Sequence, residues 1–285
     1  HRARDSRLVS VSQSALAGEA VIEQKAEKTP LIRTTLRLPQ REKRLEIENR
    51  VTKELTYAKE AAYFAFPLAM AAPRFRWATQ NGFLDPTRDL LPGASREWFC
   101  LQDWISVEAD GVAVGLTPVD APLMAIGDIV RGIWPREFGD RSANLFSYAM
   151  NNYTPEGYRA GQGGEFVFRY ALTSAPRFDP VAWHRMGRAA LTPLEINEIT
   201  RNDKLGPGTG DLPADQSSLL RVDSPDLSLV TWKEAEDRLG TVVRWVEVAG
   251  RSGVARVTLP GLRVTAAYRC NALEEIQQPL RMEQG

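Results

Sequence analysis

Short runs of alternating apolar and polar residues recur along almost the whole chain, whereas patterns with helical spacing are scarce. Alternation with a period of two places successive side chains on opposite faces of a strand, so it predicts β-structure. The clearest case covers residues 166–173, in which Phe166, Phe168 and Tyr170 fall on one face. A chain of 285 residues has room for a sizeable core. We therefore expect an all-β fold.

Turn signals and alternating runs locate several elements. Asp110-Gly111 accepts the positive φ angles of a type I′ turn, so it predicts a hairpin between its flanking runs. Asp179 precedes residues at helical spacing and predicts the cap of one short helix over residues 180–191. The alternating runs predict strands within residues 31–51 on both sides of Pro39, and at residues 63–66, 104–109, 112–116 and 166–173.

A turn-rich segment divides the sequence into two predicted domains. Residues 200–216 are rich in Gly, Pro and Asp and poor in bulky apolar side chains, which is typical of a linker. We expect a large β-domain over residues 1–205 and a small antiparallel β-sandwich over residues 215–285. The strands expected in the small domain are residues 218–222, 227–232, 241–248, 255–259 and 262–270.

Composition excludes some classes of protein. The 36 basic and 36 acidic residues balance, so no basic field indicates a nucleic-acid partner. No apolar run is long enough to cross a bilayer, and no signal peptide is visible, so the compartment stays open. Cys100 and Cys270 are the only cysteines. A bridge between them is not excluded, but we favour free buried thiols.

Planar polar and aromatic side chains gather in the Gly-rich segment before residues 166–173. Amides, phenols and guanidinium groups bind sugar hydroxyls, and aromatic faces stack on sugar rings. The same side chains can instead bond to the backbone of a tight turn or brace a loop. The candidate substrate-binding residues are Asn151, Asn152, Tyr153, Tyr158, Arg159 and Gln162.

Short motifs follow one another in a fixed order along the chain. They are Lys-Glu-Ala-Ala-Tyr-Phe-Ala-Phe-Pro at 59–67, Leu-Pro-Gly-Ala at 91–94 with Gln-Asp-Trp at 102–104, Asp-Ala-Pro-Leu at 120–123, the segment 146–173, Trp-Lys-Glu-Ala-Glu-Asp at 232–237 with Val-Val-Arg-Trp at 242–245, and Ala-Leu-Glu-Glu at 272–275. Together they resemble the C-terminal β-domains of glycoside hydrolase family 38, the α-mannosidases. The ordered set carries this resemblance, because no single motif is diagnostic.

The resemblance implies a fold and a role. It implies a large supersandwich of the galactose-mutarotase-like type, followed by a small β-sandwich. In the family, an N-terminal barrel holds a divalent metal, usually zinc, with an Asp nucleophile and an Asp acid/base, and a helical bundle follows it. The large β-domain abuts that barrel and can complete the pocket for the α-mannoside. We therefore expect this chain to pack on a missing catalytic domain, and on sister subunits of a homo-oligomer.

The sequence itself argues against a complete catalytic centre. A zinc site needs several ligands brought to one point, and the only histidines are His1 and His184. Retaining glycosidase chemistry needs two carboxylates about 5 Å apart, and no motif singles out such a pair. We predict no metal site, no other cofactor and no catalytic residue in this chain, which alone should not hydrolyse glycosides.

Several side chains carry competing interpretations. Trp98, Gln102, Asp103 and Trp104 are candidates for a platform that stacks on a sugar, but a core tryptophan at position 104 is the favoured interpretation. Asp120 is a candidate for the same pocket or for a turn cap. The glycines at 161, 163 and 164 fit a β-bulge better than a phosphate cradle, because no helical pattern follows them.

Three alternative functions stay open. A free-standing carbohydrate-binding module would bind mannose oligomers without a barrel. An aldose-epimerase-like enzyme would need a histidine facing a carboxylate in a cleft, and His184 has no evident acidic partner in the sequence. A purely structural assembly domain is the third.

Overall fold

The computed structural model describes residues 2–80, 82–129, 132, 134–152, 161–196 and 217–283. The chain divides into two compact units, His1–Leu194 and Glu195–Gly285. The predicted linker at 200–216, and the predicted domain limits at 205 and 215, lie outside the described residues and stay predictions.

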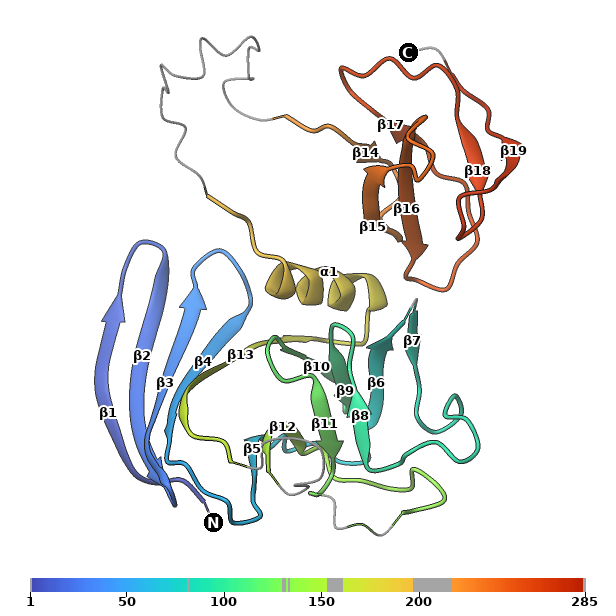
Figure 1. The fold of residues 1–285 in the computed structure, drawn as a ribbon. Helices are drawn as coiled ribbons and strands as arrows, with labels where there is room; N and C mark the ends of the chain where they lie inside the picture. The colour runs from blue at the N-terminus through green and yellow to red at the C-terminus, as the bar shows by residue number, and fades with distance from the viewer. Residues whose placement is uncertain are drawn as a thin grey trace. The chain divides into compact units, whose positions relative to one another are not determined.

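The first unit contains a sheet of nine strands in the order β1-β2-β3-β4-β13-β10-β9-β6-β7, in which every neighbouring pair is antiparallel (Figure 1). The strands are β1 (Arg4–Gln13), β2 (Ala17–Ala26), β3 (Thr29–Pro39), β4 (Leu45–Lys53), β6 (Arg74–Thr79), β7 (Gly82–Leu84), β9 (Ile105–Ala109), β10 (Val112–Pro118) and β13 (Gly164–Ala175).

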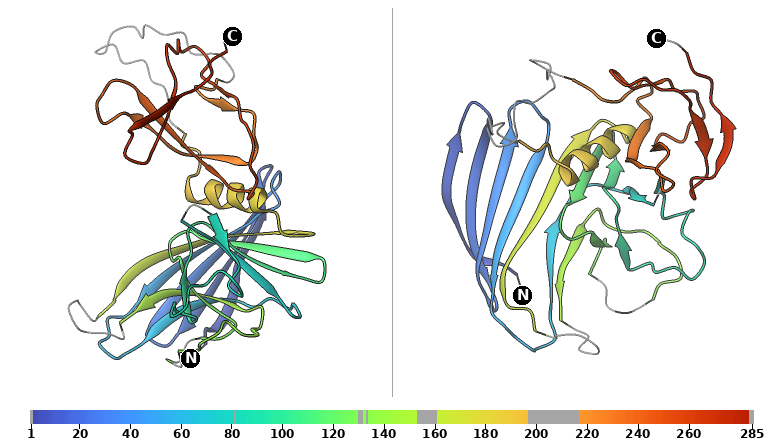
Figure 2. Two further views of the ribbon diagram at one scale, coloured as in Figure 1. Left: turned by 90° about the vertical axis from the view of Figure 1, so that its right-hand side faces the viewer. Right: turned by 45° about the horizontal axis from the view of Figure 1, so that its top comes forward.

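A second antiparallel sheet of four strands, in the order β5-β12-β11-β8, packs against this large sheet. Its strands are β5 (Ala61–Phe66), β8 (Trp98–Cys100), β11 (Leu123–Ile126) and β12 (Leu145–Asn151). The two layers are visible from two further sides in Figure 2.

The alternation in the sequence explains which side chains enter the core. Leu36 of β3 lies opposite Ile47 of β4, and Ile47 lies opposite Tyr170 of β13. Directly paired residues of antiparallel strands point to the same face, so these three side chains form one row. The strands predicted around Pro39 and over residues 63–66, 104–116 and 166–173 are confirmed.

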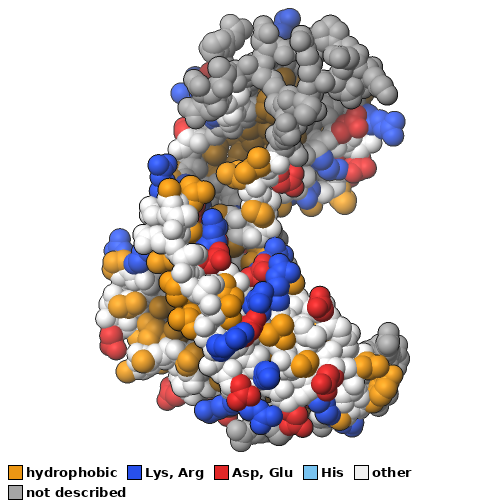
Figure 3. All heavy atoms as spheres, turned by 90° about the vertical axis from the view of Figure 1, so that its left-hand side faces the viewer, with side chains coloured by type: hydrophobic (Ala, Val, Ile, Leu, Met, Phe, Trp, Pro, Cys, Tyr) orange, Lys and Arg blue, Asp and Glu red, His pale blue; other side chains and the backbone are white. Residues whose placement is uncertain are grey.

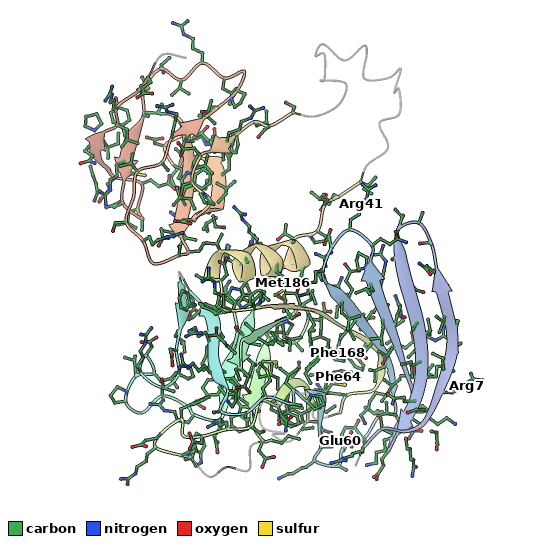
Figure 4. The ribbon with its side chains drawn as sticks, turned by 180° about the vertical axis from the view of Figure 1, so that it is seen from behind. Arg7, Arg41, Glu60, Phe64, Phe168 and Met186 are labelled. Carbon is green, nitrogen blue, oxygen red and sulfur yellow. The ribbon has the colours of Figure 1, made fainter. Side chains whose placement is uncertain are left out.

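The core lies between the two sheets and is rich in aromatic rings. Phe64 of β5 and Phe168 of β13 point toward one another (Figure 4), with ring centroids 5.6 Å apart. The edge of Phe66 meets Tyr170 at a centroid distance of 4.9 Å. Contacts of this kind add to the free energy gained by burying the rings.

A buried chain of hydroxyl groups links the two sheets inside this core. The Tyr170 hydroxyl of β13 donates to Ser147 Oγ of β12 over 2.9 Å, and Ser147 Oγ donates to the Ala121 carbonyl over 3.0 Å. Burial raises the pKa of Tyr170 above its ordinary value, which the Ser147 contact only partly offsets. The phenol therefore stays protonated and remains a hydrogen-bond donor.

The hairpin and the helix form where the sequence predicts them. Asp110 and Gly111, between β9 and β10, have φ angles of 51° and 75°, as a type I′ turn requires. Helix α1 (Pro180–Leu191) begins after Asp179, whose carboxylate accepts from the backbone N–H groups of Val181 and Ala182.

Two glycines allow α1 to lie directly on the large sheet. A Cβ atom at Gly115 of β10 would be 3.3 Å from the Trp183 ring and from the Met186 methyl group, which is labelled in Figure 4. A Cβ at Gly187 of α1 would be 2.9 Å from Asp103 Cβ. A larger residue at Gly187 would force the helix and the Asp103 segment apart, and one at Gly115 would require Trp183 and Met186 to shift.

The face of β1–β4 that points away from the core is charged. Glu23 of β2 accepts from Arg7 and Arg33 on its two neighbouring strands, and Figure 3, which looks onto this side, shows basic and acidic side chains next to one another. Such exposed pairs contribute little stability each. Strand β1 was not predicted, because it is exposed along its whole length and lacks a sustained apolar alternation.

Neither cysteine is buried. Cys100 on β8 is exposed and Cys270 is half-buried, and both are free thiols. The interpretation as free thiols is confirmed, but the expected burial is wrong. Phe99 of β8 takes the core position, which turns its neighbour Cys100 outward because successive strand residues face opposite ways.

The described residues of the second unit form three antiparallel strand pairs. They are β14 (Arg221–Val222) with β17 (Val257–Thr258), β15 (Leu227–Glu234) with β16 (Thr241–Glu247), and β18 (Tyr268–Cys270) with β19 (Ile276–Pro279). Each of the five strands predicted here overlaps an observed one, whereas β19 was not predicted.

The described part of the second unit has very little core of its own. Val248 is its only described apolar side chain that is buried, while Leu239, Val254 and Leu273 are among many that are exposed. Apolar burial is the main favourable contribution to folding. The described residues of this unit therefore gain little of that contribution.

We expect residues 217–285, produced alone, to lack a cooperative thermal transition and to bind a hydrophobic dye, as loosely packed chains do. Residues 2–194, which contain the aromatic core, should unfold cooperatively. Calorimetry and dye fluorescence of the two fragments check this. A sharp transition in the shorter fragment would show that its exposed apolar residues need no cover.

Candidate functional site

Two chain connections cross between the sheets at the same end of the first unit. One is residues 54–60, which joins β4 to β5 and includes Glu60, labelled in Figure 4. The other is residues 152–163, which joins β12 to β13 and of which residues 152 and 161–163 are described. They start and end side by side, because Gly164 pairs with Lys53 and Asn151 pairs with Ala61. We call them the crossing connections.

Asn152 fastens the two crossing connections together. Its Oδ1 accepts from the Glu60 backbone N–H over 2.7 Å, and its Nδ2 donates to the carbonyls of Thr56 and Ala58 over 3.1 and 2.9 Å. The residue is only 3% exposed. The buried amide of Asn152 is therefore fully used in hydrogen bonds to the backbone of residues 56–60.

Two lysines bind residues of the first crossing connection. The buried Lys53 ammonium forms an ion pair and hydrogen bond with the Glu60 carboxylate. Lys28 Nζ donates to the Thr56 hydroxyl over 3.0 Å. A buried cation needs a charged partner, so Glu60 fixes the point at which the connection enters β5.

Glycines explain why the crossing connections can lie so close. A Cβ atom at Gly161 would be 2.7 Å from Leu55 Cδ1, and one at Gly163 would be 2.8 Å from the Leu55 backbone. Gly164 has a φ angle of 122°, which side chains rarely tolerate. These glycines therefore serve the close approach of two backbones, which agrees with neither a phosphate cradle nor a simple bulge.

The anchored loops present polar and aromatic groups to solvent. Tyr57 is 68% exposed, and a Cβ at Gly161 would lie 3.0 Å from its Cε1 atom, so the ring lies beside the segment that holds Gln162. Asn151 and Gln162 are half-buried. A phenol ring next to amides is a combination that can stack on a sugar and bond to its hydroxyls.

The candidate substrate-binding residues fall into three groups. Asn151 and Gln162 lie at the ends of the second crossing connection, and Asn152 is committed to the backbone. The candidates that lie outside the described residues are Tyr153, Tyr158 and Arg159. Sugar binding by this set stays a prediction. Sequence reasoning missed Tyr57, although an aromatic residue just before the motif at residues 59–67 was a usable signal.

The proposed stacking platform does not form around Trp104. That ring is buried and packs against Phe83 and Phe178, so the interpretation as a core residue is confirmed. Trp98 is half-buried on β8 and stacks on Tyr148 instead.

Asp120 is occupied by an ion pair rather than aimed into a pocket. It accepts from the Arg169 backbone N–H over 2.7 Å and from its guanidinium over 2.8 and 3.0 Å. Partial burial raises the pKa of Asp120, but the Arg169 bonds outweigh it and leave the pKa below its ordinary value. The carboxylate thus connects the turn before β11 to β13.

His184 has an acidic partner, which the sequence did not reveal. Its Nδ1 lies 3.4 Å from the Asp103 carboxylate, beneath the side of α1 that also contains Gly187. Burial raises the pKa of Asp103 and lowers the pKa of His184, and the attraction between the two opposes both shifts. Helix α1 covers the His184–Asp103 pair, so the pair is placed to hold the helix. This arrangement does not favour an epimerase-like site that is open to a sugar.

Two observations concern metals and membranes. Among the described residues, no three His, Cys, Asp or Glu side chains gather as a metal site would require. In the same part of the chain, no helix is long and apolar enough to span a membrane.

The resemblance to family 38 is confirmed by comparison with known proteins. Residues 226–284 match the model of the glycosyl hydrolases family 38 C-terminal beta sandwich domain. None of the curated proteins matches the chain.

Among solved structures, the chain is similar to an α-mannosidase from Enterococcus faecalis V583, with a TM-score of 0.68 and 15% identity, over 98% of this chain and 34% of that one. Weaker likenesses are to a putative aldose 1-epimerase from Escherichia coli K12 (TM-score 0.32, 14% identity, 60% of this chain and 69% of that one) and to the heparan sulfate lyase HepC from Pedobacter heparinus (TM-score 0.30, 8% identity, 59% and 21%).

The likeness to the α-mannosidase establishes the fold as a large β-supersandwich followed by a small β-sandwich, as predicted. The chain spans about a third of the length of that α-mannosidase, since it covers 34% of it.

We expect Asn152→Ala to destabilise the first unit by roughly 1–3 kcal/mol, because it removes three part-buried hydrogen bonds to the backbone. Asn152→Asp keeps the acceptor for Glu60 but cannot donate to Thr56 or Ala58, so it should also destabilise. Gln162→Ala, the matched change at a half-buried amide of the same connection, should cost less than about 1 kcal/mol. Urea denaturation measures all three. Equal losses for Asn152→Ala and Gln162→Ala would contradict an anchoring role.

We expect the first unit to lose stability through His184 as the pH falls from about 7.5 to about 5.5. The folded pKa of His184 is lowered, so the unfolded chain binds the proton more readily. The stability that neutral His184 contributes is therefore present above its unfolded pKa and lost as the pH falls below it.

His184→Gln should flatten this pH dependence, which denaturant midpoints at the two pH values report. Asp103, whose pKa is raised, acts in the opposite sense at more acid pH, so Asp103→Asn should steepen the loss. An unchanged slope in the glutamine variant would assign the effect to another group.

Proposed function

We propose that this chain is the C-terminal, non-catalytic portion of an α-mannosidase-like glycoside hydrolase, and that it contacts the α-mannoside substrate. The match of residues 226–284 to the family 38 domain carries the proposal. The shared fold with an α-mannosidase, over 98% of this chain, supports it.

In this proposal the reactive groups belong to another part of a longer protein. Retaining hydrolysis requires one carboxylate as nucleophile and another as acid/base, about 5 Å apart. The described residues offer no clustered metal ligands. Of their buried carboxylates, Asp103 lies next to His184 and Glu97 accepts from the Trp134 N–H. We therefore assign the two carboxylates and the zinc ion to the catalytic portion.

The crossing connections would form one wall of the substrate pocket. Tyr57, Asn151 and Gln162 are the described groups placed to meet a sugar, and Arg159 is the charged candidate of the same loop. Asn152 and the Lys53–Glu60 pair would position them by fixing the backbone. A pocket gains specificity when the groups that bind the substrate are held rigidly beforehand.

An apolar face of the first unit is placed to receive the catalytic portion. The row formed by Leu36, Ile47 and Tyr170 continues outward through Ala20 of β2 to Val11 of β1, which is exposed. Leu8 and Leu38 are exposed on the same face. Exposed apolar surface that continues a core is typical of an interface, and sister subunits of a homo-oligomer are a second proposed partner.

We expect Arg159→Ala or Gln162→Ala, made in an intact enzyme with its catalytic portion, to raise KM for an α-mannoside about tenfold with little change in kcat. Such a pattern reports lost binding that is common to the ground and transition states. Gln102→Ala, which removes an exposed amide from another loop, should leave both constants unchanged. Steady-state kinetics with an aryl α-mannoside supplies the measurement.

The chain alone should not hydrolyse that substrate, and turnover by the purified chain would overturn the proposal. Unchanged KM in both loop variants would remove the sugar-contacting role while leaving the chain as a structural portion. If the isolated chain binds mannose oligomers through Gln162 but the intact enzyme is unaffected, the free-standing binding module becomes the better account.

A further inference from the structure

An exposed tryptophan stands apart from the crossing connections. Trp134, in the connection between β11 and β12, is 69% exposed. Phe138, four residues later, is buried against the core rings of Phe75 and Phe99. One connection thus inserts one aromatic ring into the core and directs another into solvent.

The backbone at Trp134 is strained. Its φ angle is 53°, in the left-handed region that bulky residues rarely adopt. Its N–H donates over 3.0 Å to Oε1 of Glu97, which is only 4% exposed. A buried carboxylate is a strong acceptor, so Glu97 offsets the strain and fixes the position at which the ring leaves the chain.

The loops next to Trp134 are joined by hydrogen bonds from two arginines. Arg141 donates to the carbonyls of Ile126, Phe138 and Arg96, and Arg96 donates to those of Leu91 and Ala94. Burial lowers the pKa of Arg141, and Glu97 opposes that shift, so the two charges lie close enough to interact. These bonds link the loop before β8, the end of β11 and the connection between β11 and β12.

This position lies at the opposite end of β12 from the crossing connections. Trp134 precedes Leu145, where β12 begins, whereas the crossing connections adjoin Asn151, where it ends. A strand of this length separates its two ends by about 20 Å. A single sugar unit cannot reach both places.

The surroundings of Trp134 fit a sugar better than a protein. The described neighbours Arg136, Glu137 and Asp140 are exposed and polar. Among the described residues of the loop before β8 and of the connection between β11 and β12, the only further exposed large apolar side chains are Leu91 and Ile129. A stable protein interface buries about 800 Å² on each partner, which such a small apolar area does not provide. A pyranose needs one aromatic face for its C–H groups and a few polar side chains for its hydroxyls.

We propose that Trp134 is the centre of a second carbohydrate-binding site, in which the indole ring stacks on a pyranose unit of a glycan and Arg136, Glu137 and Asp140 bind its hydroxyls. Glu97 is the positioning residue of this site. The site goes beyond the proposed function, because it needs neither the crossing connections nor a catalytic portion. In a longer enzyme it would retain a glycan chain at a distance from the reaction.

The test follows the indole N–H signals of the full chain by nitrogen-15 NMR during titration with α-linked mannotriose. The seven tryptophans give seven such signals, and the Trp134→Ala variant identifies the one from Trp134. We expect that signal to shift saturably while the signal of the buried Trp104 stays in place. Trp134→Ala should weaken binding at least about tenfold, by calorimetry. Trp134→Tyr, which keeps an aromatic face, should restore most of it.

The possible results are distinguishable. No saturable shift of the Trp134 signal in the parent chain, or equal affinity in the alanine variant, overturns the proposal. If Gln162→Ala abolishes binding and Trp134→Ala does not, the sugar binds at the crossing connections, which supports the proposed function and refutes this site. If the parent chain self-associates and Trp134→Ala makes it monomeric in sedimentation, the ring serves a second copy instead of a sugar.

Discussion

The interaction on which the first unit depends most is the buried hydroxyl chain from Tyr170 through Ser147 to the Ala121 carbonyl, which crosses the aromatic core. A buried hydroxyl without a hydrogen-bond partner costs free energy. The hydroxyls of Tyr170 and Ser147 and the Ala121 carbonyl are paired only when β12 sits at the observed position, or offset, along β13. Apolar contacts alone would tolerate neighbouring offsets. The hydrogen bonds therefore fix how the two sheets face one another.

That offset decides where the functional candidates lie. Ser147 is four residues before Asn151, so the position of β12 also sets where the crossing connections begin. The other end of β12 follows the connection that carries Trp134. Both proposed sugar-contacting regions thus extend from one strand, and the closely fitted glycines and buried ion pairs at its ends hold them in place. Strain at Trp134 and Gly164 is concentrated in these regions, as is common at sites that bind ligands.

Sequence reasoning succeeded where a strand shows a clear alternation in the sequence. The strands β3, β4 and β13 alternate because their core faces must be apolar, and Asp110-Gly111 and Asp179 are local signals for a turn and a helix cap. It missed β1 and β19, which are exposed. It also missed β2, β6, β11 and β12, although the last three contain buried residues. A strand without a buried face is stabilised by its neighbours, and its own sequence carries no corresponding pattern.

The same limit applies to the sites. Gly161 and Gly163 were visible in the sequence, but their reason, the approach of Leu55, depends on a segment about a hundred residues away along the chain. The pairing of His184 with Asp103 and of Trp134 with Glu97 was likewise hidden, because each joins residues from separate elements. Whether a polar side chain is free to bind a ligand is known only once its partners within the protein are known.

By itself, the amino-acid sequence determined the all-β class, the turns, the helix and the resemblance to the C-terminal part of family 38, because alternation, caps and motifs are local properties of the chain. Only the tertiary structure decided that Asn152 is an anchor, that Tyr57 lies beside the glycines and that Trp134 is held outward. The physical reason is that hydrogen bonds and close packing join residues that are distant in sequence, and these contacts exist only once the two sheets have met.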